Sequence, residues 1–176
     1  SSGTTTVNIT SGTVKAQGGD YGAGIGGGDN SRNTNITISG GTIEEAVGGS
    51  TGDGIGGGNN SSNITVTIQG GTIKKAQGGK GNFYAGHGIH SDSTLNISGG
   101  TIGTAQGGNG NSSRSGTGGD GIYSKTMEIL GGIIQKAIGG NANGNTCTGG
   151  SGIHSDGTLT ISGGEIQQAT GGDSTG

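Results

Sequence analysis

A short phrase returns six times along this chain: alternating aliphatic residues, a glycine corner and one further aliphatic residue. The copies read VNITSGTV, ITISGGTI, VTIQGGTI, LNISGGTI, MEILGGII and LTISGGEI. The last glycine of each corner recurs every 29 to 32 residues, at Gly12, Gly41, Gly71, Gly100, Gly132 and Gly164. A repeat of that period is typical of solenoids, in which each unit stacks on its neighbours. The recurrence therefore predicts about six stacked turns.

Within one repeat the aliphatic residues alternate with polar ones, as they do along a strand that buries one face. In the second unit this alternation turns five residues inward: Ile36, Ile38, Ile43, Ala46 and Ile55. Ile, Val and Thr favour strands, and glycine corners let the backbone take positive φ. One unit buries too little apolar surface to stand alone, so its strands must pair with the turns above and below. The sequence predicts an all-β, parallel β-helix (β-solenoid) over residues 1–176, as a single domain or as a segment of a longer array.

Stacking places equivalent residues of successive turns in files. Two such files are Ile25, Ile55, Ile89, Ile122 and Ile153, and Ala16, Ala46, Ala76, Ala105, Ala137 and Ala169. Outside, opposite charges alternate between turns at Lys15, Glu44, Glu45, Lys74 and Lys75, and again at Asp92, Lys125 and Asp156. Opposite charges on adjacent strands favour one register over a slipped one.

Composition limits what such a solenoid can be. Hydrophobic residues make up 24% of the chain and aromatic residues 2%, which is enough for a narrow core only. The net charge is −3 and the basic residues are dispersed, which argues against nucleic acid as a partner. No apolar run approaches the ~18 residues that a membrane span needs, so membrane insertion is not expected. The single cysteine, Cys147, has no internal disulfide partner.

Two loops of each turn vary in length in opposite directions. The loop after the paired glycines has four residues in the first two units and then eight, twelve and eleven, at 20–23, 50–53, 80–87, 109–120 and 141–151. The loop after Gly-Ile shortens from GGGDNSRNTN and GGGNNSSNIT to HSDST, YSKT and HSDGT. We therefore expect the second half of the solenoid to present a different outer face from the first.

The phrases GHGIHSDSTLNISGGTI and SGIHSDGTLTISGGEI resemble repeats of secreted bacterial carbohydrate-binding proteins with a right-handed parallel β-helix, similar in fold to polysaccharide lyases. AGIGGG and DGIGGG resemble the repeats of large bacterial surface adhesins. The resemblance implies a right-handed coil, an extracellular or cell-surface location, and a polysaccharide or cell-surface glycan as partner. Family members that bind acidic polysaccharide use calcium held by clustered carboxylates, for which this chain offers Asp92, Asp120 and Asp156.

The scarce ring side chains gather in the third to fifth units, beside carboxylates. We expect His90, Tyr123 and His154 to form an outward stack of rings, with Phe83 and Tyr84 in the loop before it. Rings beside carboxylates suit a sugar surface, and the alternative is a solvated corner packed for local stability. The carbohydrate-binding prediction comprises Phe83, Tyr84, His87, His90, Asp92, Asp120, Tyr123, His154 and Asp156.

Other chemistries find less support. His87, His90, His154 and Cys147 could be read as zinc ligands, but turns recur every ~4.8 Å, which places His90 and His154 too far apart, so no metal site is predicted. Lys125 between Asp92 and Asp156 would keep its proton and make a poor catalytic base, so no enzyme activity is predicted. Two GxGxxG matches, beginning at Gly22 and Gly52, lack the helix that a phosphate site requires.

Two further hypotheses concern the outer surface. Thr and Asn recur in two outward files that resemble the flat arrays of ice-binding solenoids, of which Glu128 interrupts the second: Thr6, Asn35, Thr65, Thr94, Thr126 and Thr158, and Asn8, Thr37, Thr67, Asn96, Glu128 and Thr160. In a eukaryotic source, glycans are expected at the sequons of Asn8, Asn35, Asn59, Asn60, Asn63, Asn96 and Asn111.

The two ends of the array carry no recognisable cap, and unpaired strands recruit other chains. This pattern predicts either a longer parent solenoid or end-to-end association into a fibre. Leu130, Ile133 and Ile138 take positions that are polar in most other units, which adds an apolar stripe near the C-terminal end.

Overall fold

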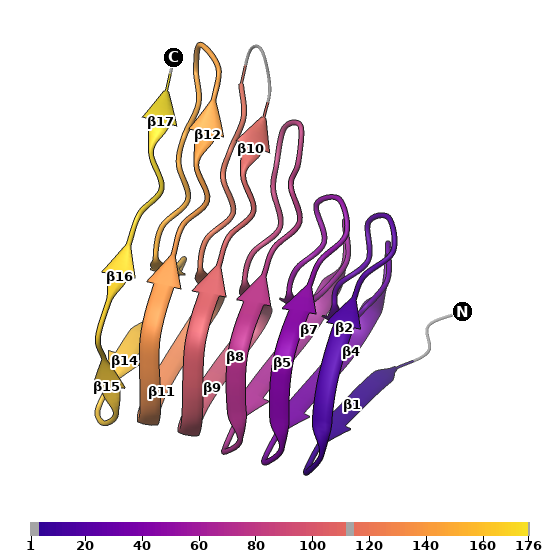
Figure 1. Cartoon of the computed structure of the whole chain (residues 1–176), viewed down its shortest axis with the longest axis vertical. Coiled ribbons are helices and arrows are strands. Elements are labelled where there is room, and N and C mark those ends of the chain that lie inside the picture. The colour runs from indigo at the N-terminus through magenta and orange to yellow at the C-terminus, as the bar shows by residue number, and fades with distance from the viewer. Residues whose placement is uncertain (1–3, 112–114, 176) are drawn as a thin grey trace.

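The computed structural model describes residues 4–111 and 115–175 and shows a right-handed parallel β-solenoid (Figure 1). Every strand pairing is parallel, and each joins one turn of the coil to the next. A fourteen-stranded sheet wraps the body, and a three-stranded sheet lies outside it. The described residues contain no helix long and apolar enough to cross a membrane. The fold class predicted from the repeat is confirmed.

The strands follow the repeat. The first long side of the coil contains β1 (Thr5–Ile9), β4 (Arg32–Ile38), β7 (Ser62–Ile68) and β14 (Leu159–Ile161). The second contains β2 (Thr13–Gln17), β5 (Thr42–Val47), β8 (Thr72–Gln77), β15 (Glu165–Ile166) and β16 (Ala169–Thr170). In the fourth and fifth turns the sides merge into β9 (Ile89–Gln106) and β11 (Ile122–Ile138). The short Gly-Ile side contains β3 (Ile25–Gly26), β6 (Ile55–Gly56) and β13 (Ile153–Ser155).

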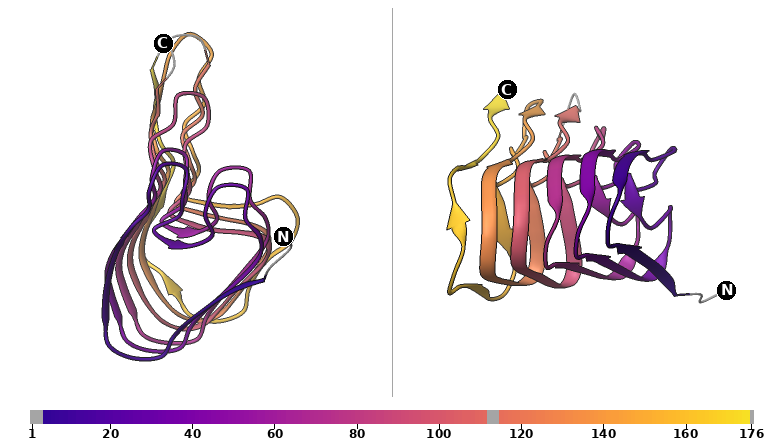
Figure 2. Two further views of the ribbon diagram at one scale, coloured as in Figure 1. Left: turned by 90° about the vertical axis from the view of Figure 1, so that its right-hand side faces the viewer. Right: turned by 60° about the horizontal axis from the view of Figure 1, so that its bottom comes forward.

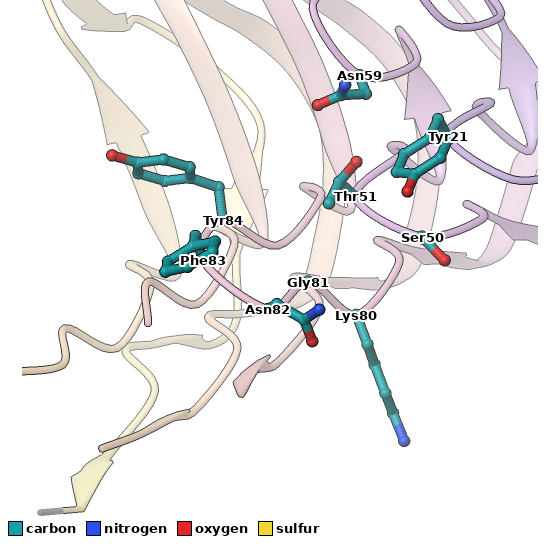
Figure 3. Close-up of a pocket in the computed structure, with 9 residues that line it drawn as sticks. All are labelled: Tyr21, Ser50, Thr51, Asn59, Lys80, Gly81, Asn82, Phe83 and Tyr84. Carbon is teal, nitrogen blue, oxygen red and sulfur yellow. The ribbon is translucent and has the colours of Figure 1, made fainter. Parts of the chain in front are cut away.

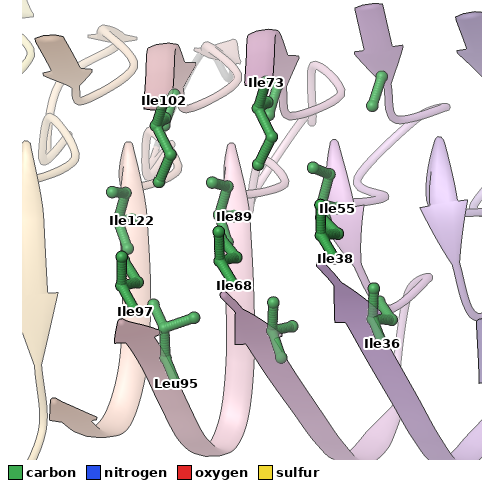
Figure 4. Close-up of a cluster of buried hydrophobic side chains, with 14 of the residues drawn as sticks. Ile36, Ile38, Ile55, Ile68, Ile73, Ile89, Leu95, Ile97, Ile102 and Ile122 are labelled. Atoms are coloured by element: carbon green, nitrogen blue, oxygen red, sulfur yellow. The ribbon is translucent and has the colours of Figure 1, made fainter. Parts of the chain in front are cut away.

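The core is the narrow file of aliphatics that the alternation predicts (Figure 4). Ile36, Ile38, Ile43, Ala46 and Ile55 are all buried. The pairing of Ile25 with Ile55, Ile55 with Ile89, and Ile89 with Ile122 continues to Ile153, and the alanine file is paired in the same way from Ala16 to Ala169. Both predicted files are therefore confirmed, because one Ile or Ala per turn fills the space that a tight coil leaves.

Charge alternation sets the register on the second long side. Glu45 accepts from Lys15 of the turn before at 3.3 Å and from Lys75 of the turn after at 3.2 Å, and Lys74 lies 2.8 Å from Glu44. Each exposed pair contributes only about 0–1 kcal/mol, so their value lies in disfavouring a slipped register. At the other corner, Lys125 forms no ion pair with a described residue, and the pairing predicted there is absent.

A thin projection rises from the coil where the loops after the paired glycines stack, and we call it the fin (Figure 2). It grows from the N-terminal turns to the C-terminal turns, as the loop lengths predict. Near its tip run β10 (Gly110–Asn111), β12 (Ala142–Asn143) and β17 (Ser174–Thr175), which form the three-stranded sheet.

A file of glycines joins the fin to the body, and we call it the glycine spine: Gly19, Gly22, Gly49, Gly52, Gly79, Gly86, Gly108, Gly119, Gly140, Gly150 and Gly172. Each amide of this series donates to the carbonyl of the preceding member, with N–O distances of 2.8–3.0 Å. The bonds cross back and forth between the two limbs of successive loops. A Cβ on any member from Gly49 onward would lie 1.5–2.1 Å from a spine carbonyl oxygen. Only glycine allows this approach.

Apolar side chains reach the surface near the C-terminal end. Leu130 is 46% exposed on the fifth turn, while Ile133 and Ile138 are half-buried. Leu159 and Ile161 of β14 are exposed at the last turn, where no further strand pairs with them in this structure. End-to-end association stays a prediction.

The glycine spine predicts a contrast between two equivalent substitutions. Gly79→Ala would place Cβ 1.5 Å from the Gly49 carbonyl oxygen, whereas Cβ at Gly19, the same position in the first turn, meets nothing within 4 Å. We expect Gly79→Ala to cost more than ~3 kcal/mol of unfolding free energy and Gly19→Ala less than ~0.5 kcal/mol. Chemical denaturation measures both. Equal effects would show that the close approach does not limit stability.

Candidate functional site

A cleft of about 350 Å³ opens beside the fin where the second turn meets the third (Figure 3). Its lining contains three of the four Phe and Tyr side chains of the chain: Tyr21, Phe83 and Tyr84. These rings are 48%, 60% and 74% exposed. The other lining residues are Ser50, Thr51, Asn59, Lys80, Gly81 and Asn82. We call this hollow the aromatic cleft.

The cleft results from the change in loop length. The loops of the first two turns are short, and the third loop, which carries Phe83 and Tyr84, rises above them (Figures 1 and 3). Tyr21 and Thr51 hold equivalent places in the short loops, and both have positive φ, at 62° and 60°. Their amide and carbonyl groups bind the neighbouring turns, since Thr51 N–H donates to the Lys80 carbonyl and the Tyr21 carbonyl accepts from Asn59 N–H.

A second hollow of about 170 Å³ adjoins the first, and we call it the histidine groove. Thr51, Asn59 and Tyr84 line both hollows. The groove adds Asp53, Gly58, Asn60, Ser61, Ala85, Gly86, His87 and His90. The sequence prediction included Tyr84, His87 and His90 but not Asp53, Tyr21 or Thr51.

Asp53 anchors the histidine groove. Its side chain is 5% exposed and accepts three hydrogen bonds. His87 N–H donates to Oδ1 at 2.8 Å, Gly57 N–H donates to Oδ2 at 2.9 Å, and His90 Nδ1 lies 2.6 Å from Oδ2. Gly56 makes this arrangement fit, because a Cβ there would lie 2.8 Å from Asp53 Oδ2. The buried carboxylate is thereby paired and hydrogen-bonded, as burial of a charge requires.

Asp120 repeats this arrangement two turns further on. Ser151 N–H donates to Oδ1 at 2.6 Å, and His154 Nδ1 lies 3.0 Å from Oδ2. In both cases Asp-Gly-Ile of one turn meets Gly-Ile-His of the next turn. The sequence contains this signal, as GDGI at 52–55 and 119–122 and GIH at 88–90 and 152–154. These two sequences identify Asp53 as the partner of His90 once the pairing of turns is known.

His87 links the two Asp–His units. Its Nδ1 accepts the Asp120 N–H at 2.9 Å, so the ring is neutral and carries its proton on Nε2. The ring stacks on Tyr123 with centroids 4.8 Å apart and an interplanar angle of 17°. The Tyr123 hydroxyl in turn donates to Asp156 Oδ2 at 2.5 Å. The network therefore runs continuously from the second turn to the fifth.

The ring stack differs from the one that the sequence predicts. His90, Tyr123 and His154 do lie side by side in register. Their planes, however, meet at 58° and 68°, and the ring stacked on Tyr123 is His87. The predicted file of three rings is present, but its rings are tilted because the imidazoles of His90 and His154 turn toward the carboxylates of Asp53 and Asp120.

The network shifts several pKa values. Burial alone would lower the pKa of His90, but the charge and hydrogen bond of Asp53 outweigh it and raise this pKa above its usual value. Burial likewise would raise the pKa of Asp53, and His90 instead keeps it low. Burial lowers the pKa of His87, and the nearby charges of Asp53 and Asp120 only partly oppose this effect. Burial and the bond to Asp156 raise the pKa of Tyr123 to about 12.

Among the described residues, Asp53, His87 and His90 are the group whose ligand atoms come within 4.8 Å of one another. Hydrogen bonds engage the Nδ1 atoms of both histidines, because His87 Nδ1 accepts an amide proton and His90 Nδ1 faces Asp53. Asp92 is engaged elsewhere, since its Oδ1 accepts Ile64 N–H at 2.6 Å. Calcium binding by Asp92, Asp120 and Asp156, and the absence of a metal, stay predictions.

The sequons lie on the surface. Asn8, Asn35, Asn60, Asn63 and Asn111 are exposed, and Asn59 and Asn96 are half-buried. Asn59 also lines both hollows, so a glycan on Asn59 would occupy the site. Glycosylation stays a prediction.

Comparison with protein families shows which family the chain belongs to. The beta helix repeat family matches residues 7–29, 36–59, 66–93 and 159–176, which together exceed half of the chain. The chain belongs to this family. The first three matched segments contain the residues that line the aromatic cleft. Neither curated proteins nor solved structures gave a match. The family match supports the β-helix, and a ligand does not follow from it.

The shifted pKa values predict that His87 and His90 titrate on opposite sides of the usual histidine pKa. Folded His90 keeps its proton to higher pH than the unfolded chain does, so its stabilisation is complete below the usual pKa and is lost as pH rises through the raised one. His87 acts in the opposite sense, because its stabilisation is lost as pH falls below the usual pKa.

NMR titration of the imidazole resonances measures both midpoints. Asp53→Asn should lower the pKa of His90, because burial then acts without the opposing charge. Asp156→Asn, which removes a carboxylate that His90 does not contact, is the matched control. One shared midpoint for His87 and His90 in the wild-type protein would contradict the proposed network.

Proposed function

We propose that this chain is a non-catalytic, extracellular β-solenoid module that binds carbohydrate in the aromatic cleft. The observation that carries the proposal is the gathering of Tyr21, Phe83 and Tyr84 at one hollow in a chain that has one other aromatic residue of this kind. Exposed apolar groups that cluster in a hollow are typical of binding sites. Tyr and Phe present large flat faces at low entropy cost, and such faces suit the C–H face of a sugar ring.

Hydrogen-bonding groups surround these rings. Ser50, Asn59, Asn82 and Lys80 line the same cleft and can meet the hydroxyl rim of a sugar. The mixture of flat apolar faces and polar side chains fits a saccharide better than a purely apolar ligand. This site overlaps the one predicted from sequence at Phe83 and Tyr84, and it lies toward the N-terminal side of the predicted ring cluster.

A binding role, rather than an enzymatic one, agrees with the state of the ionisable groups. Asp53 is committed to three hydrogen-bond donors. Lys125, the base considered from sequence, is exposed on the outer surface and lies outside both hollows. A glycan ligand would place the protein outside the cell or at its surface, in line with the location implied by the repeat resemblance.

A glycan array tests the proposal. The wild-type protein should bind a defined subset of glycans, and the double substitution Phe83→Ala and Tyr84→Ala should weaken binding by ~10-fold or more, since stacked rings contribute about 0.5–1.5 kcal/mol each beyond their buried area. Leu130→Ala is the matched control, because it removes a comparably exposed apolar side chain elsewhere. An array without any bound glycan would refute the proposal.

A second candidate function is ice binding. Strand pairing aligns Asn8, Thr37, Thr67 and Asn96 on neighbouring turns of one face, as the array hypothesis requires. Glu128 occupies the next place in this file and interrupts it. This candidate predicts thermal hysteresis that Thr37→Lys and Thr67→Lys abolish, and a nanolitre osmometer measures it. Unshaped ice crystals in the wild-type solution would exclude it.

A further inference from the structure

The aromatic cleft and the histidine groove meet at three shared residues. Thr51, Asn59 and Tyr84 line both, so the two hollows adjoin. The volume of the aromatic cleft, about 350 Å³, is about twice that of the histidine groove, about 170 Å³. Both lie between the second and third turns. The two adjoining hollows differ in chemistry, with exposed rings in the aromatic cleft and imidazoles in the histidine groove.

Thr51, at the junction, is held in an unfavourable state. Its φ is 60°, which a β-branched residue rarely adopts. Its Oγ1 is shielded from solvent and has no hydrogen-bond partner among the described residues. Both features cost free energy in the folded protein. Strain of this kind concentrates at functional sites.

The histidine end offers hydrogen-bond donors. The Asp53 carboxylate is occupied by three donors, so it has little capacity left for a ligand. His87 uses Nδ1 as an acceptor and keeps its proton on Nε2. His90, with its Nδ1 directed at Asp53, carries a further N–H when it is protonated. A sugar unit at this end is therefore recognised by an acceptor oxygen, such as an amide carbonyl or a carboxylate.

We propose that a glycan chain of at least two units spans both hollows. One sugar ring lies on the aromatic cleft, and a unit that carries a hydrogen-bond acceptor lies in the histidine groove. Thr51, which lines both hollows, contacts the chain between them. This inference rests on the proposed carbohydrate function and specifies its ligand. A single sugar fills one hollow only, whereas a linked pair engages both and gains from the linkage.

Calorimetry with three pairs of sugars tests the spanning chain: N-acetylglucosamine with chitotetraose, galacturonate with tetragalacturonate, and glucose with cellotetraose. Chitotetraose supplies amide carbonyls, tetragalacturonate supplies carboxylates, and cellotetraose supplies neither. We expect one of the first two tetramers to bind at least ~10-fold more tightly than its own monomer and than cellotetraose. His90→Gln should weaken that tetramer and leave its monomer unchanged.

Each contrary result has a distinct meaning. A monomer that binds as tightly as its tetramer overturns the spanning chain, and cellotetraose binding as tightly as both other tetramers overturns the acceptor requirement. In either case carbohydrate binding itself still holds. If none of the six sugars and no array glycan binds, the proposed function fails, and this inference fails with it.

Thr51→Gly gives an independent test. Glycine adopts φ near 60° without strain, so the melting temperature should rise by a few degrees while the affinity for the preferred tetramer falls. Asn30→Gly is the control, because Asn30 also has positive φ, at 55°, but lines neither hollow. A Thr51→Gly protein with unchanged tetramer affinity would overturn the role of Thr51 at the junction.

Discussion

The close contact between backbone groups in the glycine spine is the constraint on which the rest of this molecule depends. Each bond joins one limb of a loop to the next, so the spine ties body and fin together at every turn. Because the carbonyl oxygens occupy the space of the missing side chains, the spacing of the limbs is fixed by the peptide groups themselves. The aliphatic files then have to fill only a slim core of constant width.

Function can vary on such a frame because loop length is independent of the spine. The third loop rises above its short predecessors, and this step between turns creates the aromatic cleft. In the adjoining histidine groove, Asp53 contacts His87 and His90 of the next turn. A binding site thus arises where the repeat is least regular, and the regular turns on either side hold it in place.

The sequence predicts well those features that depend only on the repeat. The isoleucine file, the alanine file and the Lys15–Glu45–Lys75 register all follow from equivalent residues being one turn apart. Periodicity also locates the general region of the rings, since Tyr84, His87 and His90 do line a hollow.

The remaining site residues depend on the path of irregular loops. Tyr21 and Thr51 come from two different turns, and no local sequence motif predicts that they share a cleft with Phe83. Asp53 is buried by a histidine 37 residues away, so its role is visible only when Asp-Gly-Ile and Gly-Ile-His are aligned by turn. The repeat pattern also does not predict the orientation of the rings, because contacts with Asp53 and Asp120, rather than ring stacking, orient His90 and His154.

The fin has a thermodynamic consequence of its own. It buries peptide groups rather than hydrocarbon, and exposure of polar surface lowers the heat capacity of unfolding whereas exposure of apolar surface raises it. With a slim apolar core and a large share of buried backbone, this chain should have a small heat-capacity change for its length. Its stability curve would then be broad and shallow, with little loss on cooling, because the interactions that hold the fin together do not weaken as the hydrophobic effect does at low temperature.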